Sequence, residues 1–212
     1  MDYRKNLFSS EFVAINAIVF LNYCNIALFF YFTEYLSSIS IPHEWFGFLL
    51  SVFSLVILIL RPILSPFSNP QNSRKWLVWS VLAIILILCC YGFARGVISM
   101  TVVRILHGAA YTVMTVAITS RLVVSIPREK SSLAFSVISI ISLAPYAIVP
   151  PAVIMATGIL GSFPATLVVA AVLMGFTFPL LLLVPRQFGG ISSEVSSKLS
   201  LADIRTNFRN TS

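Results

Sequence analysis

The chain has 212 residues, of which 58% are hydrophobic and 10% are charged, and its formal net charge is +7. A water-soluble domain averages roughly 45–50% apolar and about 25% charged residues. This composition excludes a soluble domain, because too few polar side chains remain to cover so large an apolar core. The 17 Phe, 7 Tyr and 3 Trp residues also exclude a disordered chain. We therefore expect an integral membrane protein.

Six apolar segments follow one another along the chain. A membrane-spanning helix needs about 20 mostly apolar residues, and segments of this kind occupy residues 11–36, 45–64, 76–94, 97–120, 132–156 and 163–184. Short polar connections separate them, including a loop expected over 65–75 and a turn at Arg95-Gly96. Membrane β-barrels show only a weak alternation of apolar residues. The sequence thus predicts an all-α, polytopic integral membrane protein with six transmembrane helices.

The composition divides the chain into three regions. Residues 1–10 form a cytoplasmic N-terminus, residues 11–185 the transmembrane domain, and residues 186–212 a polar, serine-rich cytoplasmic tail. Within the tail, residues 200–208 are expected to form a short amphipathic helix, with Ser200 at its N-cap.

The distribution of positive charge predicts the orientation. Lys and Arg concentrate in cytoplasmic connections of membrane proteins. With a cytoplasmic N-terminus, 12 of the 14 Lys and Arg residues fall on the cytoplasmic side or in the tail, and only Arg95 and Arg104 do not. We expect a multi-pass protein of the cell membrane with both termini in the cytoplasm. No basic cluster exceeds two adjacent residues, so nucleic acid is not an expected partner.

Metal and cofactor chemistry find no support in the sequence. Cys24, Cys89 and Cys90 lie within apolar segments, and together with His43 and His107 they lack the spacing of zinc ligands. The membrane segments contain no paired carboxylates that would hold a catalytic metal. We expect neither a metal nor a cofactor, and we do not expect an enzyme.

The fourth segment carries a polar stripe. At 100° per residue, one helical face collects Arg104, His107, Gly108, Tyr111, Thr115 and Thr119. Charged residues at membrane depth usually face a cavity or a partner, so the stripe predicts a polar cavity lining. The alternative is that Arg104 extends toward the outer interface. His107 is either a proton carrier or a helix-packing residue.

The first segment carries a second stripe. Its members are Glu11, Ile18, Asn22, Asn25, Phe29 and Thr33, whereas Asn16 and Glu34 point the other way. Asn22 and Asn25 are candidates for hydrogen bonding to a ligand. Asparagine side chains also join helices to one another within membranes, and the sequence does not choose between these two roles.

The stretch LRPILSPFSNPQNSRKWL, which starts at Leu60, resembles the signature loop between the second and third helices of the major facilitator superfamily. Arg61, Pro62, Arg74, Lys75 and Leu77 agree with that pattern. Asn69 replaces the acidic residue of the motif; Ser65, Pro70 and Asn72 are further departures. The resemblance implies a gating loop formed by Arg61, Asn69, Arg74 and Lys75, without the usual acidic charge.

The fourth segment strengthens the same resemblance. The run from Arg104 to Ala110 is similar to the family motif whose arginine faces the central cavity and is linked to proton coupling in antiporters. The resemblance implies a small-molecule transporter that works by alternating access, with Asn22, Asn25, Arg104, His107 and Tyr111 as candidate substrate-binding or coupling residues. Protons are then a candidate coupling ion, and export a candidate direction.

Family members have two six-helix halves with the substrate site between them, whereas this chain supplies six helices. We interpret it as the N-terminal half bundle, whose tail resembles the linker between halves. Its expected partners are the lipid bilayer, a small-molecule substrate and a second half, in the same longer chain or in another copy. The alternative is a six-helix membrane protein or regulatory remnant that does not transport.

Overall fold

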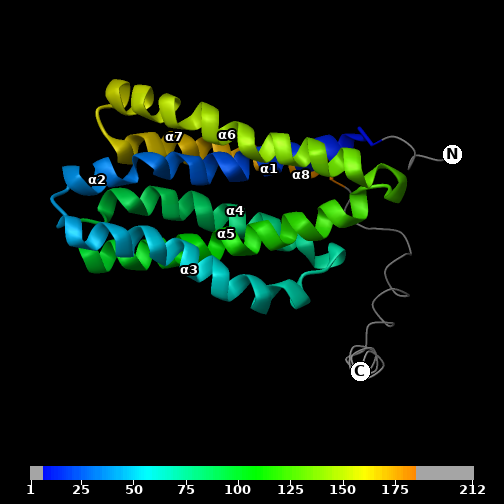
Figure 1. The fold of residues 1–212 in the computed structure, drawn as a ribbon, viewed down its shortest axis with the longest axis horizontal. Helices are drawn as coiled ribbons and strands as arrows, with labels where there is room; N and C mark the ends of the chain where they lie inside the picture. Colours follow the sequence, from blue (N-terminus) through cyan, green and yellow to red (C-terminus); the bar gives the residue numbers. More distant parts are fainter. Residues whose placement is uncertain (1–6, 185–212) are drawn as a thin grey trace, which may run out of the picture.

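Six long helical segments form one elongated bundle in the computed structural model, which describes residues 7–184 (Figure 1). Each segment is long and apolar enough to cross a membrane; the six are Ser10–Ser38, His43–Phe67, Pro70–Phe93, Val97–Ser125, Ser131–Leu160 and Phe163–Leu182. The described residues contain helices and turns but no strand. The prediction of an all-α protein with six transmembrane helices is confirmed.

Two of the six segments contain a short irregularity. The first consists of α1 (Ser10–Ala27), a 3-10 turn at Leu28–Tyr31, and α2 (Phe32–Ser38), and the last consists of α7 (Phe163–Gly175) and α8 (Thr177–Leu182). The four segments between them are built on α3 (Phe46–Leu64), α4 (Pro70–Cys90), α5 (Val97–Ser125) and α6 (Ser131–Leu160). Helix α6 runs continuously past Pro145, Pro150 and Pro151.

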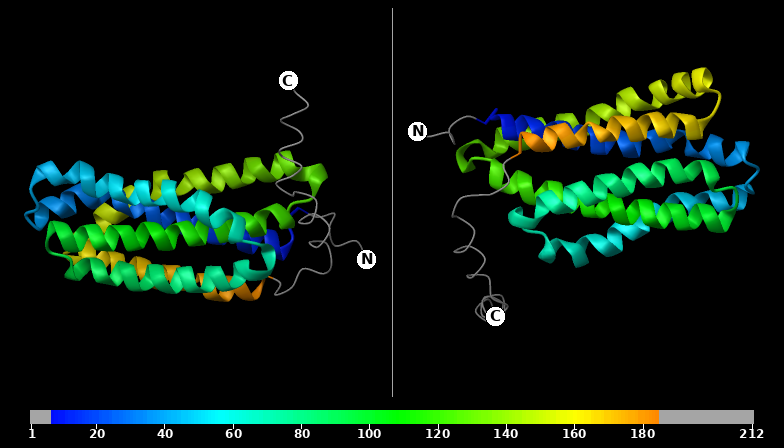
Figure 2. Two further views of the ribbon diagram at one scale, coloured as in Figure 1. Left: turned by 90° about the horizontal axis from the view of Figure 1, so that it is seen from below. Right: turned by 180° about the vertical axis from the view of Figure 1, so that it is seen from behind.

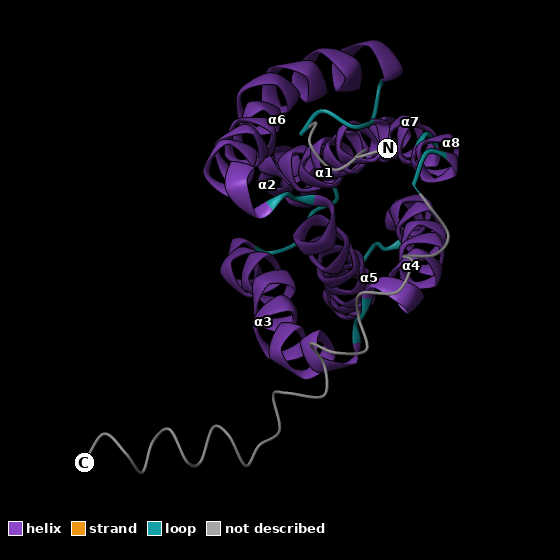
Figure 3. Cartoon of the chain, turned by 90° about the vertical axis from the view of Figure 1, so that its right-hand side faces the viewer, coloured by secondary structure: helices purple, strands orange, loops and turns teal. Residues whose placement is uncertain are grey.

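Helices α1 and α5 lie at the centre of the bundle (Figure 3). Helix α5 packs against α3, α4 and α1, and α1 also packs against α6, α7 and α8. Helices α3 and α6 lie at the periphery and expose large apolar side chains such as Leu58 and Ile140. Such side chains suit a lipid environment, where burial against protein is not required.

The loop expected over 65–75 is much shorter than predicted. Asn69 caps the N-terminus of α4 by accepting a hydrogen bond from the Asn72 backbone, and the Asn72 side chain returns the bond to the Asn69 backbone. Pro70 occupies the first helical position, where its missing N–H costs nothing. The third helix therefore begins at Pro70 rather than at residue 76, and Arg74 and Lys75 lie within it.

Helices α3 and α5 approach each other closely at Gly108. A Cβ atom at this position would lie 3.0 Å from the Phe53 carbonyl oxygen and 3.0 Å from Val56 Cβ. The space that glycine leaves on the polar stripe is thus filled by a neighbouring helix.

The start of α1 and the two connections richest in Lys and Arg lie at the same end of the bundle. Figure 1 places the N-terminal end of α1 beside the α3–α4 and α5–α6 connections, and the two remaining views agree (Figure 2). The expected N-terminal cations, most of the expected cytoplasmic tail and its amphipathic helix over 200–208 lie outside the described residues.

Candidate substrate and coupling site

Arg104 is buried inside the half bundle, with only 3% of its surface exposed. Its Nε donates a hydrogen bond to the Leu49 carbonyl oxygen on α3, at 3.0 Å. The guanidinium carbon lies 5.0, 4.4 and 5.0 Å from the ring centroids of Phe29, Phe32 and Phe53. A cation held over aromatic faces in a desolvated site is stabilised by their negative electrostatic potential.

The burial of Arg104 agrees with neither of the two geometries considered for it, an open cavity lining or extension to the outer interface. The side chain does not extend to the outer interface, because aromatic rings from the first segment and from α3 enclose it. It also does not line an open wall of the six-helix bundle. Its role in substrate binding or coupling stays a prediction.

His107, one turn along α5, is completely buried and joins two other segments. Its Nε2 lies 3.1 Å from the Asn25 amide nitrogen on α1, and its Nδ1 lies 3.1 Å from the Tyr91 hydroxyl, in the 3-10 turn Tyr91–Phe93 after α4. Tyr35 donates a hydrogen bond to the Tyr91 carbonyl oxygen. We call Asn25, Tyr91, Arg104 and His107 the polar network; it ties the first, third and fourth segments together.

Tyr91 is a member of this network that the sequence analysis missed. It lies at the end of the third segment, and nothing in the local pattern distinguishes it from other tyrosines near membrane boundaries. Only the packing of α4 beside α5 brings its hydroxyl to the histidine ring.

Asn22 and Tyr111 form a second polar contact between α1 and α5. Tyr111 interacts with the Asn22 side chain and lies close to the phenols of Tyr23 and Tyr146. The Tyr23 and Tyr146 rings meet edge to face, with centroids 6.1 Å apart. The Oδ1 atom of Asn22 is buried and has no hydrogen-bond partner. Three phenols from α1, α5 and α6 thus lie near one another, and one of them, Tyr111, contacts an asparagine whose amide oxygen has no hydrogen-bond partner.

The four predicted gating residues lie at one end of the bundle but do not form a single cluster. Arg61 and Lys75 are exposed, and Asn69 serves as the α4 cap. Arg74 is half-buried, and its guanidinium donates a hydrogen bond to the Val184 carbonyl oxygen, at 2.6 Å. It thereby ties the start of α4 to the residues that follow α8.

The charge distribution places Arg121 among the cytoplasmic-side cations, and the structure shows that its side chain is fully buried. Its Nε donates to the Ser73 hydroxyl on α4 at 2.8 Å. Ser125 in the next turn of α5 donates to a Glu11 carboxylate oxygen on α1 at 3.1 Å, and this carboxylate interacts electrostatically with Arg121. Charge counting missed this contact because it joins three helices that are distant in sequence.

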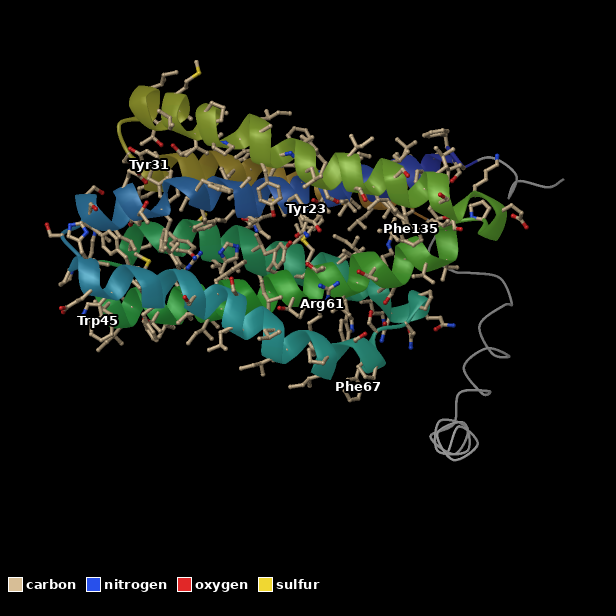
Figure 4. The ribbon with its side chains drawn as sticks, in the orientation of Figure 1. Tyr23, Tyr31, Trp45, Arg61, Phe67 and Phe135 are labelled. Atoms are coloured by element: carbon tan, nitrogen blue, oxygen red, sulfur yellow. The ribbon has the colours of Figure 1, made fainter. Side chains whose placement is uncertain are left out.

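The side chains drawn in Figure 4 show Tyr23 in the middle of the bundle, whereas Trp45 and Phe67 lie at opposite ends of the segment that contains α3. The polar residues described above therefore occupy two levels. Asn22 and Asn25 lie near the middle of the first membrane segment (Ser10–Ser38), and His107 and Tyr111 near the middle of α5. Arg74 lies near the start of α4 and Arg121 near the end of α5.

Comparison with known proteins gives one result for the whole bundle. The sequence model of the Major Facilitator Superfamily matches residues 15–210. Neither the comparison with curated proteins nor the comparison with solved structures found a match. The matched range includes five of the six membrane segments completely and most of the first. This chain, a multi-pass membrane protein, therefore belongs to the major facilitator superfamily, a family of membrane transporters.

Proposed function

We propose that this chain is the N-terminal half of a secondary transporter that moves a small molecule across the cell membrane by alternating access. In this proposal Asn22, Asn25, Arg104, His107 and Tyr111 recognise the substrate or couple its movement to an ion such as a proton. Both termini lie in the cytoplasm. Membrane transport itself follows from membership of the family; the residues, the mechanism and the orientation are the proposal.

The observation that carries the proposal is the unneutralised charge of Arg104. In the part of the chain that the structure describes, it contacts a carbonyl oxygen, three aromatic rings and the Tyr91 side chain, and no carboxylate pairs with it. A charged group within a membrane is costly and is usually retained for a function. A rearrangement that exposes the guanidinium to the space between two halves would present a positive charge to an anionic group of a substrate.

The second half is proposed from the peripheral helices. Helices α3 and α6 expose apolar faces along most of their length, including Leu55, Leu58, Ile140 and Ile148. A second six-helix half packed on these faces would enclose the polar residues of α1 and α5 between the halves, as the general architecture of such transporters requires. The half would come from the same longer chain or from another copy.

The gating residues are proposed to act at the end of the bundle that carries the N-terminus. Arg74 and Arg121 both bond to groups on other segments there. Rocking of one half against the other would strain these two hydrogen bonds. The exposed Arg61 and Lys75 are available for contacts with a second half. Asn69 holds the start of α4 without contributing a charge.

One further observation favours the alternative, a six-helix membrane protein that does not transport. The polar network is densely packed and nearly free of exposed surface, as expected of a structural connection. The two candidates differ in what the loss of the Arg104 charge does to ligand binding.

The test begins with the purified chain, screened for thermal stabilisation by panels of anionic, neutral and cationic solutes. The uptake of each stabilising solute is then measured in vesicles that contain the protein together with a second half. Arg104→Met removes the charge and keeps a long side chain between the three Phe rings. We expect it to abolish ligand stabilisation and uptake while the protein stays folded.

Arg95→Ala is the matched control, because Arg95 is an exposed cation at the nearby α4–α5 turn. It should bind and transport as the unaltered protein does. Normal binding and uptake by Arg104→Met would overturn the role of the Arg104 charge. Failure of every solute class to stabilise or enter would favour the non-transporting alternative.

A further inference from the structure

Tyr91 lies between Arg104 and His107 in the polar network. Its hydroxyl oxygen is 3.1 Å from His107 Nδ1, and it also shares a hydrogen bond with the Arg104 side chain. Tyr91 and His107 are completely buried, so their polar atoms depend on partners within the bundle. The two contacts of the Tyr91 hydroxyl therefore determine the direction in which its proton points.

The Arg104 guanidinium can only donate a hydrogen bond, because it has N–H groups and no acceptor. Its bond to Tyr91 therefore occupies a lone pair of the phenol oxygen, and the single hydroxyl proton is left for the other neighbour, His107 Nδ1. A ring nitrogen that accepts this bond carries no proton of its own. A neutral His107 ring must then carry its proton on Nε2.

The surroundings of His107 disfavour a second positive charge on its ring. The ring packs against Phe29 and Phe53, with centroids 5.0 and 5.2 Å away, and the charge of Arg104 acts on it from the preceding turn of α5. Among the described residues, no carboxylate bonds to His107 or Arg104. A charged imidazole in this apolar place, beside another cation, would be costly, so the ring is neutral.

Asn25 supports the same position of the proton. Its amide nitrogen faces His107 Nε2, and its Oδ1 atom is buried without a hydrogen-bond partner. In that orientation Nε2 has to accept, Nδ1 carries the proton, and the Tyr91 hydroxyl proton has no acceptor, so two buried groups are left unsatisfied. A half-turn of the amide exchanges its nitrogen and oxygen. The oxygen then accepts from Nε2–H, Tyr91 donates to Nδ1, and only the amide N–H groups are left unsatisfied.

We propose that Tyr91 is a positioning residue of the candidate site. It accepts a hydrogen bond from Arg104, donates its own to His107 Nδ1, and thereby holds the ring in the neutral form with its proton on Nε2 and the Asn25 amide oxygen turned toward that proton. The consequence for recognition rests on the function proposed above. Arg104 and Asn25 then both offer N–H donors, which favour an anionic group of a substrate over a cationic one.

The preferred arrangement leaves one fewer buried polar group without a partner. Such a group costs about 1–3 kcal/mol, which corresponds to about a fivefold to 150-fold preference for the Nε2–H form of the ring over the Nδ1–H form. Removal of the Tyr91 hydroxyl makes the two forms nearly equivalent, because each then leaves one ring nitrogen and one Asn25 group unsatisfied.

The experiment uses the full chain in detergent, with the ring nitrogens of histidine isotope-labelled for nuclear magnetic resonance. His43→Gln removes the other histidine of the chain, which is exposed in the 3-10 turn before α3, so every ring signal comes from His107. Couplings to the ring C–H protons identify each nitrogen, and its chemical shift shows whether it carries the proton. We expect the Nε2–H form to exceed the Nδ1–H form at least fivefold.

One variant and a matched control test the role of Tyr91. Tyr91→Phe keeps the ring and removes the hydroxyl, so the preference for Nε2–H should fall at least threefold. Tyr31→Phe removes a hydroxyl from a half-buried tyrosine whose ring packs against Phe163, and it should leave the preference unchanged. An anionic solute that stabilises the unaltered protein should bind Tyr91→Phe at least threefold more weakly.

A proton on Nδ1, or on both ring nitrogens, of the His43→Gln protein would overturn the proposal, and this spectrum decides even if Tyr91→Phe fails to fold. A full Nε2–H preference in Tyr91→Phe would overturn the positioning role. If Tyr91→Phe moves the proton but no solute binds the unaltered protein, the positioning of His107 holds and the proposed transport function fails.

Discussion

The Asn25 amide nitrogen and the His107 Nε2 atom lie 3.1 Å apart, although 82 residues separate them in the chain. Both side chains are almost completely buried. The contact connects the two central helices, α1 and α5, inside the apolar bundle. Its partner at the opposite ring nitrogen, the Tyr91 hydroxyl, extends the connection to the third membrane segment. The His107 ring therefore links the first, third and fourth membrane segments.

The first prediction concerns this contact. Asn25→Leu leaves a buried ring nitrogen without its partner, so we expect the free energy of unfolding to fall by about 1–3 kcal/mol. A double-mutant cycle with His107→Phe, measured by unfolding in detergent, should give a coupling energy of about 0.6–1.7 kcal/mol.

A second cycle, with Asn16→Leu in place of Asn25→Leu, provides the comparison. Asn16 lies more than two helical turns away on α1 and does not bond to His107, so the two substitutions should be additive to within about 0.5 kcal/mol. Equal coupling in the two cycles would refute a direct Asn25–His107 interaction.

The second prediction concerns the α3–α5 crossing. Gly108→Ala places a Cβ atom 3.0 Å from the Phe53 carbonyl oxygen and from Val56 Cβ, so the helices must move apart. We expect a loss of about 1–3 kcal/mol in the free energy of unfolding, as for other overpacked sites. Thermal unfolding in detergent measures the loss.

The matched control is Gly158→Ala in α6, where nothing lies within 4 Å of the added atom. It should be neutral or stabilise the protein by up to about 1 kcal/mol, because alanine is the better helix former. If Gly108→Ala behaved like this control, the close approach would not limit the packing of α3 on α5.

The third prediction separates the two properties of Asn69. Asn69→Ala removes the side-chain acceptor from the α4 capping box and should cost about 1 kcal/mol. Asn69→Asp keeps the cap and adds a negative charge at a helix N-terminus, so stability should be equal or higher. In a complete two-half protein, the added charge should also shift the balance between access states.

Cysteine accessibility from the two membrane sides measures that shift, and the stability of each variant is measured in parallel. Accessibility that is identical in Asn69→Asp and the unaltered protein would show that the loop charge does not influence access. A stability loss in Asn69→Asp as large as that in Asn69→Ala would contradict the capping role.

The fourth prediction concerns orientation. Ser38 and Arg95 are exposed at one end of the bundle, and Lys75 and Glu129 at the other. Single cysteines at these positions should react with an impermeant reagent from outside the cell at 38 and 95, and only after permeabilisation at 75 and 129. The reason is the concentration of Lys and Arg at the second end.

The background for this experiment should lack Cys24, Cys89 and Cys90, because all three are free thiols and Cys90 is exposed. Labelling from outside at 75 and 129, with protection at 38 and 95, would reverse the proposed topology.

Hydropathy alone was sufficient to locate the six membrane segments, because a lipid environment demands long uninterrupted apolar helices whatever their neighbours are. It placed the start of the third segment too late. The helix that begins at Pro70 opens with polar and basic residues, and its start depends on the hydrogen bonds between Asn69 and Asn72 rather than on hydrophobicity.

The sequence by itself also determined which polar residues share a face of α1 or α5, since helical periodicity is a property of one segment. The tertiary structure alone decided what those faces meet. Three Phe rings from two other segments enclose Arg104, and Tyr91 from a third reaches His107. Asn16, on the opposite side of α1 from Asn25, is buried as well, because neighbouring helices cover both sides of this central helix. The neighbours of a side chain depend on how helices pack across the bundle, and a pattern within one helix carries no information about that packing.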